Sequence, residues 1–310
     1  MSKTITLIES ERPDHQQLAR KIVDEVLPHT GKAIRLGITG VPGVGKSTFI
    51  ESLGMLLVEN GHRVAVLAVD PSSSRSGGSV MADKTRMEKL AVEKNAFIRP
   101  SPSGGTLGGV ARKTRETMMV CEAAGFNVII VETVGVGQSE TTVASMVDFF
   151  LVLMLAGAGD ELQGIKRGVL ELADALAINK ADGDNIEKAQ KAAKIYTTAL
   201  HMLQPASPNW DPPVLTCSAL EMTGIAEIWQ MVLKFHKQFT RSGELEHKRR
   251  KQALDWLWSM VEDELKQRFY NNPEIRQRLD QIKRAVARGE TAPTLAADKL
   301  LFFLDNQRSV

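Results

Sequence analysis

The stretch GITGVPGVGKSTF runs from Gly37 to Phe49 and carries four glycines, one lysine and one serine. Its central part, Gly40 to Ser47, matches the pattern G-x-x-x-x-G-K-[ST] at every fixed position. Glycines let the backbone curl so that successive N–H groups point at a phosphate, and a following helix adds its positive end. The pattern predicts that Lys46 reaches the β and γ phosphates of a nucleotide and that the Ser47 hydroxyl ligates Mg²⁺. The expected phosphate-binding residues are Gly40, Val41, Pro42, Gly43, Val44, Gly45, Lys46, Ser47 and Thr48.

On both sides of this loop, short apolar runs alternate with helical patterns. Runs of Val, Ile and Leu with little polar alternation are typical of strands that are buried on both faces, as in a parallel sheet. The helical pattern after the loop ends at Asn60 and Gly61, a pair that favours helix termination. This order predicts an α/β protein of the P-loop type with a mostly parallel, doubly wound sheet. Strands are expected at residues 34–39, 64–69, 96–98, 128–131, 149–156, 175–178 and 214–216.

The two ends of the chain have a different pattern. Residues 10–28 read as a helix before the first strand, and from about Ser242 onward no strand pattern remains. Breaks near Pro273 and Gly289 divide the C-terminal part into three helices, which are too thin to bury their own aromatic side chains. This part therefore packs on the sheet or forms an interface. The expected domains are an N-terminal helical extension at 1–30, a nucleotide-binding domain at 31–241 and a C-terminal helical arm at 242–310.

Composition excludes several classes of protein. The chain has 310 residues, of which 43% are hydrophobic and 25% charged, and these values are ordinary for a globular protein. The net charge of +2 gives no argument for nucleic acid or a membrane surface, and the basic run from Lys248 to Lys251 reads as a solvated helix face. No apolar run reaches roughly 18 residues, so no membrane span is expected. Two cysteines, Cys121 and Cys217, form no disulfide framework and favour the cytoplasm.

A second motif is expected to recognise the base of the nucleotide. Asn179, Lys180 and Asp182 belong to the pattern N-K-x-D and directly follow an expected strand. A carboxylate accepts hydrogen bonds from N1–H and the 2-amino group of guanine, and adenine offers neither donor there. Asp182 therefore predicts a guanine nucleotide, GTP or GDP. The triplet after the last strand, namely Ser218, Ala219 and Leu220, is expected to form a second guanine-contact loop.

Acidic residues at strand ends beside the loop indicate a metal site. Asp70 follows the strand at 64–69, and Glu132 follows the strand at 128–131. Carboxylates at this edge are well placed to hold Mg²⁺ or its waters, together with Ser47. Asp83, in a glycine-rich and polar segment, is a further candidate ligand. Gly135 is expected to donate its N–H to the γ-phosphate and so to sense its loss.

Taken together, these stretches resemble the MeaB/ArgK family of P-loop GTPases, relatives of the methylmalonic aciduria type A protein. The resemblance covers about residues 30–240. The members of this family are GTPase chaperones of adenosylcobalamin-dependent acyl-CoA mutases, chiefly methylmalonyl-CoA mutase. They gate cofactor loading and protect the mutase. The resemblance also implies a homodimer built with the C-terminal arm. The stretches that carry it are 37–49, VDPSS at 69–73, GGS at 77–79, DKTRM at 83–87, VETVGVGQSE at 131–140, GDELQGIK at 159–166, NKAD at 179–182 and TCSAL at 216–220.

The resemblance assigns a third switch that faces nucleotide and partner, with Asp160, Gln163 and Lys166 as functional candidates. In Ras-like proteins a glutamine follows the switch glycine directly, whereas here Val136 holds that position and Gln138 is displaced by two residues. Because no arginine finger is evident, we expect slow intrinsic GTP hydrolysis that a partner accelerates. The residues expected to act in catalysis are Lys46, Glu132, Gln138 and Lys166.

Three alternatives stay open at this stage. A nickel-insertion GTPase belongs to the same wider class, although the six histidines here are scattered along the chain. A P-loop kinase needs an acceptor pocket and generally reads adenine, which Asp182 disfavours. A nucleotide-gated scaffold would bind without needing turnover. No Asp-x-His-x-x-Gly stretch of the kind that ligates cobalamin occurs, so that cofactor is expected on the partner.

Overall fold

The computed structural model describes residues 1–69, 87–100, 107–133, 139–157, 167–203 and 207–305 of the chain. The chain forms two compact units, Met1–Gln252 and Ala253–Val310. The first unit is built on a seven-stranded sheet, and the second is helical where it is described. The division between the units falls inside one long helix, about ten residues beyond the boundary that we expected at 241/242.

The sheet is parallel throughout and has the strand order β3-β2-β4-β1-β5-β6-β7. From β1 the chain crosses to β2 on one side, and from β4 it crosses to β5 on the other side of β1. The carboxyl end of β1 therefore lies at the topological switch point, where ligands bind in sheets of this kind. The predicted α/β class and doubly wound sheet are confirmed. The strands are β1 (Ile34–Gly40), β2 (Val64–Val69), β3 (Ala96–Arg99), β4 (Val128–Thr133), β5 (Phe149–Leu155), β6 (Ala175–Asn179) and β7 (Val214–Thr216).

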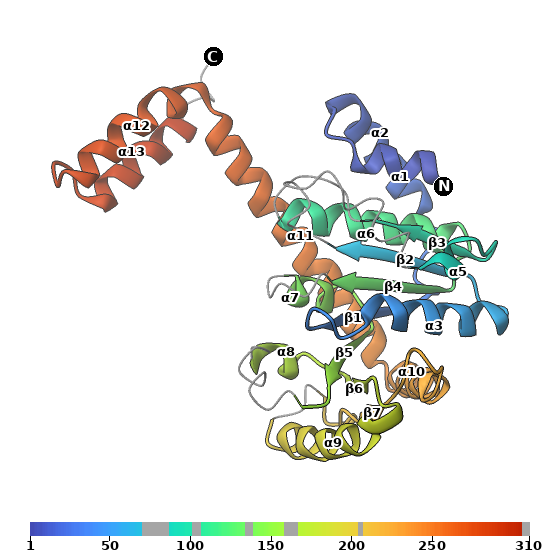
Figure 1. The fold of residues 1–310 in the computed structure, drawn as a ribbon. Coiled ribbons are helices and arrows are strands. Elements are labelled where there is room, and N and C mark those ends of the chain that lie inside the picture. Colours follow the sequence, from blue (N-terminus) through green and yellow to red (C-terminus); the bar gives the residue numbers. More distant parts are fainter. Residues whose placement is uncertain (70–86, 101–106, 134–138, 158–166, 204–206, 306–310) are drawn as a thin grey trace. The chain divides into compact units, whose positions relative to one another are not determined.

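Helices cover both faces of the sheet (Figure 1), and an apolar core lies on each face. On one face Phe49 and Leu53 of α3 and Phe235 of α10 pack against strand residues, and all three are fully buried. On the other face Cys121 of α6 and Tyr196 of α9 fill the same role. The first face carries α3 (Lys46–Glu59), α5 (Glu88–Ala91) and α10 (Ile225–Ser242), and the second carries α6 (Leu107–Ala123), α7 (Glu140–Ala144), α8 (Arg167–Glu171) and α9 (Ile186–His201).

The N-terminal segment forms two helices, α1 (Ser2–Glu9) and α2 (Pro13–Val26), followed by a short 3₁₀ turn, η1 (Leu27–His29). The helix that we expected over residues 10–28 is confirmed as α2 with the turn that follows it, whereas α1 was not predicted. Pro13 occupies the first turn of α2, where its missing N–H costs nothing, and Ser10 is extended, so no helix can run through this point. Both helices pack on α6, and α1 buries Ile5 and Ile8 in the second core.

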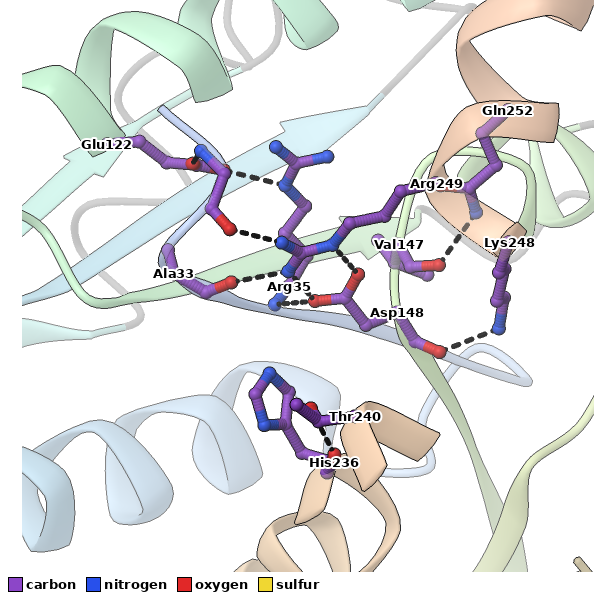
Figure 2. Close-up of polar contacts among 11 residues, drawn as sticks. Ala33, Arg35, Glu122, Val147, Asp148, His236, Thr240, Lys248, Arg249 and Gln252 are labelled. Atoms are coloured by element: carbon purple, nitrogen blue, oxygen red, sulfur yellow. Dashed lines mark hydrogen bonds and ion pairs between the residues drawn. The ribbon is translucent and has the colours of Figure 1, made fainter. Parts of the chain in front are cut away.

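The helix α11 (Glu244–Asn271) begins against the amino-terminal edge of the sheet (Figure 2). Arg249 binds Asp148 just before β5, and Lys248 donates to the Asp148 carbonyl at 2.6 Å and pairs with Asp174 at 3.4 Å. The interpretation of the basic run as a solvated helix face was therefore wrong for these two residues. Arg250 does fit it, since 74% of its side chain is exposed. A buried carboxylate is stable only when it is paired with a cation or hydrogen-bonded. The first turns of α11 supply the cations for the carboxylates that precede β5 and β6.

The second unit consists of the later part of α11 with α12 (Pro273–Ala287) and α13 (Pro293–Asp305), and α12 packs against α13. The expected break is confirmed at Asn272, whose side-chain oxygen accepts from the backbone N–H groups of Glu274 at 2.9 Å and Ile275 at 3.3 Å. These bonds cap α12 at its first turn. Among the described residues, no helix is long and apolar enough to cross a membrane.

Candidate functional site

The loop between β1 and α3 joins the centre of the sheet to a 14-residue helix. Gly43 and Gly45 adopt positive φ angles of 78° and 92°, a region that side chains disfavour. Val44 between them is fully buried and anchors the loop in the core. Apart from Gly43 itself and its two chain neighbours, no heavy atom of the described residues lies within 4 Å of the Cβ position of Gly43, so the loop has room at this point for a bound group. The geometry fits a phosphate held by backbone N–H groups at a helix N-terminus.

Lys46 opens α3 and folds back over this loop. Its Nζ donates to the Gly40 carbonyl at 2.7 Å and to the Val41 carbonyl at 3.2 Å, and the residue is only 9% exposed. The ammonium group is therefore held at the loop, where it can meet a polyphosphate. Ser47 follows in the first turn of α3 and is partly buried, while Thr48 and Pro42 are exposed.

Asn179, the last residue of β6, connects the phosphate loop to the loop after β7. Its Nδ2 donates to the Val44 carbonyl at 2.8 Å, and its Oδ1 accepts from the Ala219 N–H at 3.1 Å. The side chain is buried, and a Cβ added at Gly45 would lie 2.9 Å from its Nδ2. Glycine is therefore required at Gly45 for two reasons, the backbone angle and the approach of Asn179. The buried amide holds three chain segments together.

The remaining candidates for base recognition lie in the loop after β6 and in the loop after β7. The Ser218 hydroxyl donates to an oxygen of Asp182 and accepts from the N–H of Glu221 at 3.1 Å, which orients the Asp182 carboxylate. Lys180 has a positive φ of 60°, and its Cε lies 4.0 Å from the Cβ position of Gly45, so its stem runs along the phosphate loop. Leu220 is 81% exposed beside these polar groups. A flat base can be bound between such an apolar side chain and a lysine stem.

The metal side of the site is described in part. Glu132 lies within β4, opposite Ile38 of β1, and is 9% exposed. The next residue, Thr133, shares a hydrogen bond of 2.6 Å with the hydroxyl of Thr39, the residue before Gly40. This buried hydroxyl pair joins the ends of β1 and β4. In the described part of the chain, no group of three or more His, Cys, Asp or Glu side chains is arranged to hold a metal ion. The candidates Asp70, Asp83, Gly135, Gln138, Asp160, Gln163 and Lys166 lie outside the described residues.

Four polar side chains at this site, those of Thr39, Thr133, Ser52 and Cys217, were not predicted from the sequence. Thr39 and Thr133 form the hydroxyl pair, and Ser52 of α3 donates to the Ala219 carbonyl at 2.6 Å. Cys217 directs its Sγ at Asn179 Oδ1 at 3.6 Å, and burial raises the pKa of this thiol to about 12. The thiol therefore stays protonated and can act as a weak donor. The only local signal for Ser52 was a polar residue on the apolar face of a helix.

The parallel sheet, the glycine loop after β1 and the lysine that opens α3 define a P-loop nucleoside triphosphatase. A family model described as "Methylmalonyl Co-A mutase-associated GTPase MeaB" matches residues 1–274. The chain belongs to this family, and it is a GTPase. The resemblance that the motifs indicated is confirmed.

Known proteins are similar to this chain over nearly its whole length. GTPase ArgK of Escherichia coli (strain K12) is 48% identical over 307 residues, which cover 99% of this chain and 93% of that protein. The methylmalonic aciduria type A homolog, mitochondrial, of Mus musculus is 45% identical over 311 residues, with coverage of 97% and 75%. The crystal structure of an LAO/AO transport system kinase has a TM-score of 0.79 and 43% identity, and covers 98% of this chain and 92% of that one. This structure has the same fold.

Proposed function

We propose that this GTPase is a chaperone of an adenosylcobalamin-dependent acyl-CoA mutase of the methylmalonyl-CoA mutase type, and that it gates cofactor loading and protects the mutase. The observation that carries the proposal is membership of a family whose description names association with methylmalonyl-CoA mutase. The name of the mouse relative, which refers to methylmalonic aciduria, supports the same role. In this account the cobalamin is bound by the mutase and not by this chain.

In the proposed nucleotide site, the loop from Gly40 to Gly45 binds the phosphates through backbone N–H groups, and Lys46 neutralises charge between the β and γ phosphates. Ser47 would ligate Mg²⁺ directly, and Glu132 would reach it through a bound water, with Asp70 and Asp83 as further ligands. The bound Mg²⁺ would withdraw charge from the γ-phosphate oxygens. The partly buried Ser47 hydroxyl and the nearly buried Glu132 carboxylate are oxygen donors of the kind that Mg²⁺ prefers.

Guanine is the proposed base. The Ser218 hydroxyl orients Asp182 for N1–H and the 2-amino group, and Lys180 and Leu220 would cover the ring. With adenine, the carboxylate would lose both donors, which costs on the order of 2–4 kcal/mol. Asn179 contributes by holding the two reading loops against the phosphate loop.

We further propose that the partner completes the catalytic site. The displaced Gln138 and the segment with Asp160, Gln163 and Lys166 would be ordered by the mutase, with Gly135 sensing the γ-phosphate. Slow turnover alone and faster turnover in the complex are the behaviour of a timing device.

A homodimer is the proposed assembly, and the second unit supports it. Its helices expose apolar side chains that a lone unit leaves in water, and those on α11 follow helical spacing along one stripe. A second copy of the arm is the expected cover for this stripe. The exposed residues are Leu254, Leu257, Trp258, Val261, Leu265, Tyr270, Leu295, Leu301 and Phe302.

The description of the solved relative as a kinase gives the second candidate function a specific basis. The two activities differ in the fate of the γ-phosphate. A GTPase releases one inorganic phosphate for each GTP consumed, whereas a kinase transfers the phosphoryl group to an acceptor. Measuring phosphate release and GDP formation together, with and without cell metabolites, distinguishes them. Equal amounts support the GTPase, and GDP in excess of phosphate supports a kinase.

The gating role is tested with purified mutase, adenosylcobalamin and this protein loaded with GTP, GDP or a non-hydrolysable GTP analogue. The absorbance of mutase-bound cobalamin reports loading. We expect loading to require hydrolysable GTP and to stop with the analogue. Loading that is the same in all three states would contradict the proposal.

A further inference from the structure

Ser52 is a polar residue in the apolar face of α3. It lies among the fully buried side chains Phe49, Ile50 and Leu53, and it is itself only 8% exposed. A buried hydroxyl without a hydrogen-bond partner costs free energy, so a serine at this position must have a partner. The Oγ donates to the backbone carbonyl of Ala219 at 2.6 Å, across 167 residues of sequence. The phosphate-binding helix is thereby joined to the loop after β7.

This bond closes a ring of contacts around the nucleotide site. Ala219 is held from both sides, since its carbonyl accepts from Ser52 and its N–H donates to Asn179 at 3.1 Å. Asn179 in turn donates to the Val44 carbonyl at 2.8 Å, and Val44 leads through Lys46 into α3. Each member of the ring belongs to a loop or helix that contacts a different part of the proposed nucleotide. The Ser52 bond is the link that ties the loop at 218–220 directly to the helix.

We propose that Ser52 is a positioning residue for recognition of the base, which fixes the loop with Ser218 and Leu220 relative to the phosphate-binding helix. The inference rests on the proposed guanine site and deepens it. The side chain does not touch the nucleotide. It fixes the distance between the base-recognition loop and the phosphate-binding loop. Its loss therefore weakens the binding of guanine nucleotides and leaves binding through the phosphates unchanged.

The test compares GDP and ADP affinities, measured by displacement of a fluorescent GDP analogue, for the unmutated protein and Ser52→Ala. We expect the GDP affinity to fall about two- to tenfold, the effect of one neutral hydrogen bond of about 0.5–1.5 kcal/mol. The ADP affinity should stay within a factor of two, so the ratio of the two affinities falls. A structural role alone would lower both affinities equally, and that result would overturn the proposal, as would an unchanged GDP affinity.

A matched control is Thr114→Val. Thr114 is also buried and donates its hydroxyl to a backbone carbonyl, that of Val110 in α6, at 2.9 Å. This variant should lose stability to thermal unfolding without changing the GDP to ADP ratio. If Ser52→Ala fails to fold, Ser52→Thr and Ser52→Cys replace it, since both fill the space and only the first keeps a strong donor. A lower ratio in Ser52→Cys than in Ser52→Thr supports the role, and equal ratios overturn it. An unmutated protein with no preference for GDP would instead refute the guanine site itself.

Discussion

Arg249 of α11 binds the carboxylate of Asp148 in a two-point contact, with Nε to Oδ1 at 2.7 Å and Nη2 to Oδ2 at 2.6 Å (Figure 2). The guanidinium also donates to the carbonyls of Gly31 and Ala33, ahead of β1. The Asp148 side chain is 1% exposed, and it also accepts from the backbone N–H of Arg35 at 2.9 Å. One ion pair thus fixes the first turns of α11 to the starts of both β1 and β5, the two neighbouring central strands.

Replacing Arg249 with Met should destabilise the first unit strongly. Removing one partner of a buried pair leaves an uncompensated charge and typically costs about 3–5 kcal/mol, and the partial exposure of Arg249 favours the lower end. Denaturant unfolding measures the change. The control is the neighbouring Arg250→Met, whose pair with Glu246 is mostly exposed and should cost less than about 0.5 kcal/mol. Similar losses for both variants would contradict the special role of Arg249.

His236 of α10 predicts a pH dependence of stability. Burial lowers the pKa of His236; Asp148 raises it and Arg249 lowers it further. The unfolded chain therefore takes up a proton on this residue at a pH where the folded chain does not. The contribution of neutral His236 to the free energy of unfolding is fully present above its ordinary pKa of 6.5. This contribution is lost as the pH falls toward the lower pKa that the residue has in the folded protein. In His236→Gln, the free energy of unfolding measured in urea should depend less on pH between pH 7.5 and 5. An unchanged slope would show that the residue does not titrate in this way.

Asp182→Asn should change the base preference. The amide oxygen can still accept from Ser218, while the new N–H₂ group can donate to xanthine, which has a carbonyl where guanine has an amino group. GTP affinity should fall by about 2 kcal/mol and XTP affinity should rise. Titrations of GTP, ATP and XTP against both forms measure this. Equal GTP and ATP affinities in the unmutated protein would contradict guanine recognition.

Lys46→Ala should abolish GTP hydrolysis, because it removes the cation that lies over the loop. Ser47→Ala should instead raise the Mg²⁺ concentration needed for turnover, since it removes one proposed ligand. Turnover across a Mg²⁺ series distinguishes the two effects. Unchanged kinetics in Lys46→Ala would place the active site elsewhere.

The parts of this structure that depend on local pattern could be predicted from the sequence. Apolar runs located the seven strands, and glycines with a following lysine located the loop, because both depend on neighbouring residues. The break at Asn272 was predicted for the same reason, since the cap is made within one turn. The exact start of α2 at Pro13 also has a local signal, because a proline in the first turn marks where a helix begins.

Contacts between distant parts of the chain could not be predicted in this way. Arg249 and Asp148 are separated by 101 residues, and Ser52 and Ala219 by 167. Nothing beside Arg249 in the sequence distinguishes it from the exposed Arg250, since only the arrangement of the strands brings a buried carboxylate to one and not the other. The buried hydroxyl of Ser52 likewise finds its partner only once the fold brings the loop after β7 against α3.

The central claim, that a cobalamin-dependent mutase completes this GTPase, is tested most directly by the GTP turnover rate with and without purified mutase from the same source. We predict that the mutase clearly raises the turnover rate. The increase should not exceed the range of about 10³–10⁵-fold that an arginine supplied by a partner gives in other G proteins. Gln163→Ala should keep the basal rate and lose most of the stimulation. No stimulation of the unmutated protein, or equal stimulation of the variant, would contradict the account.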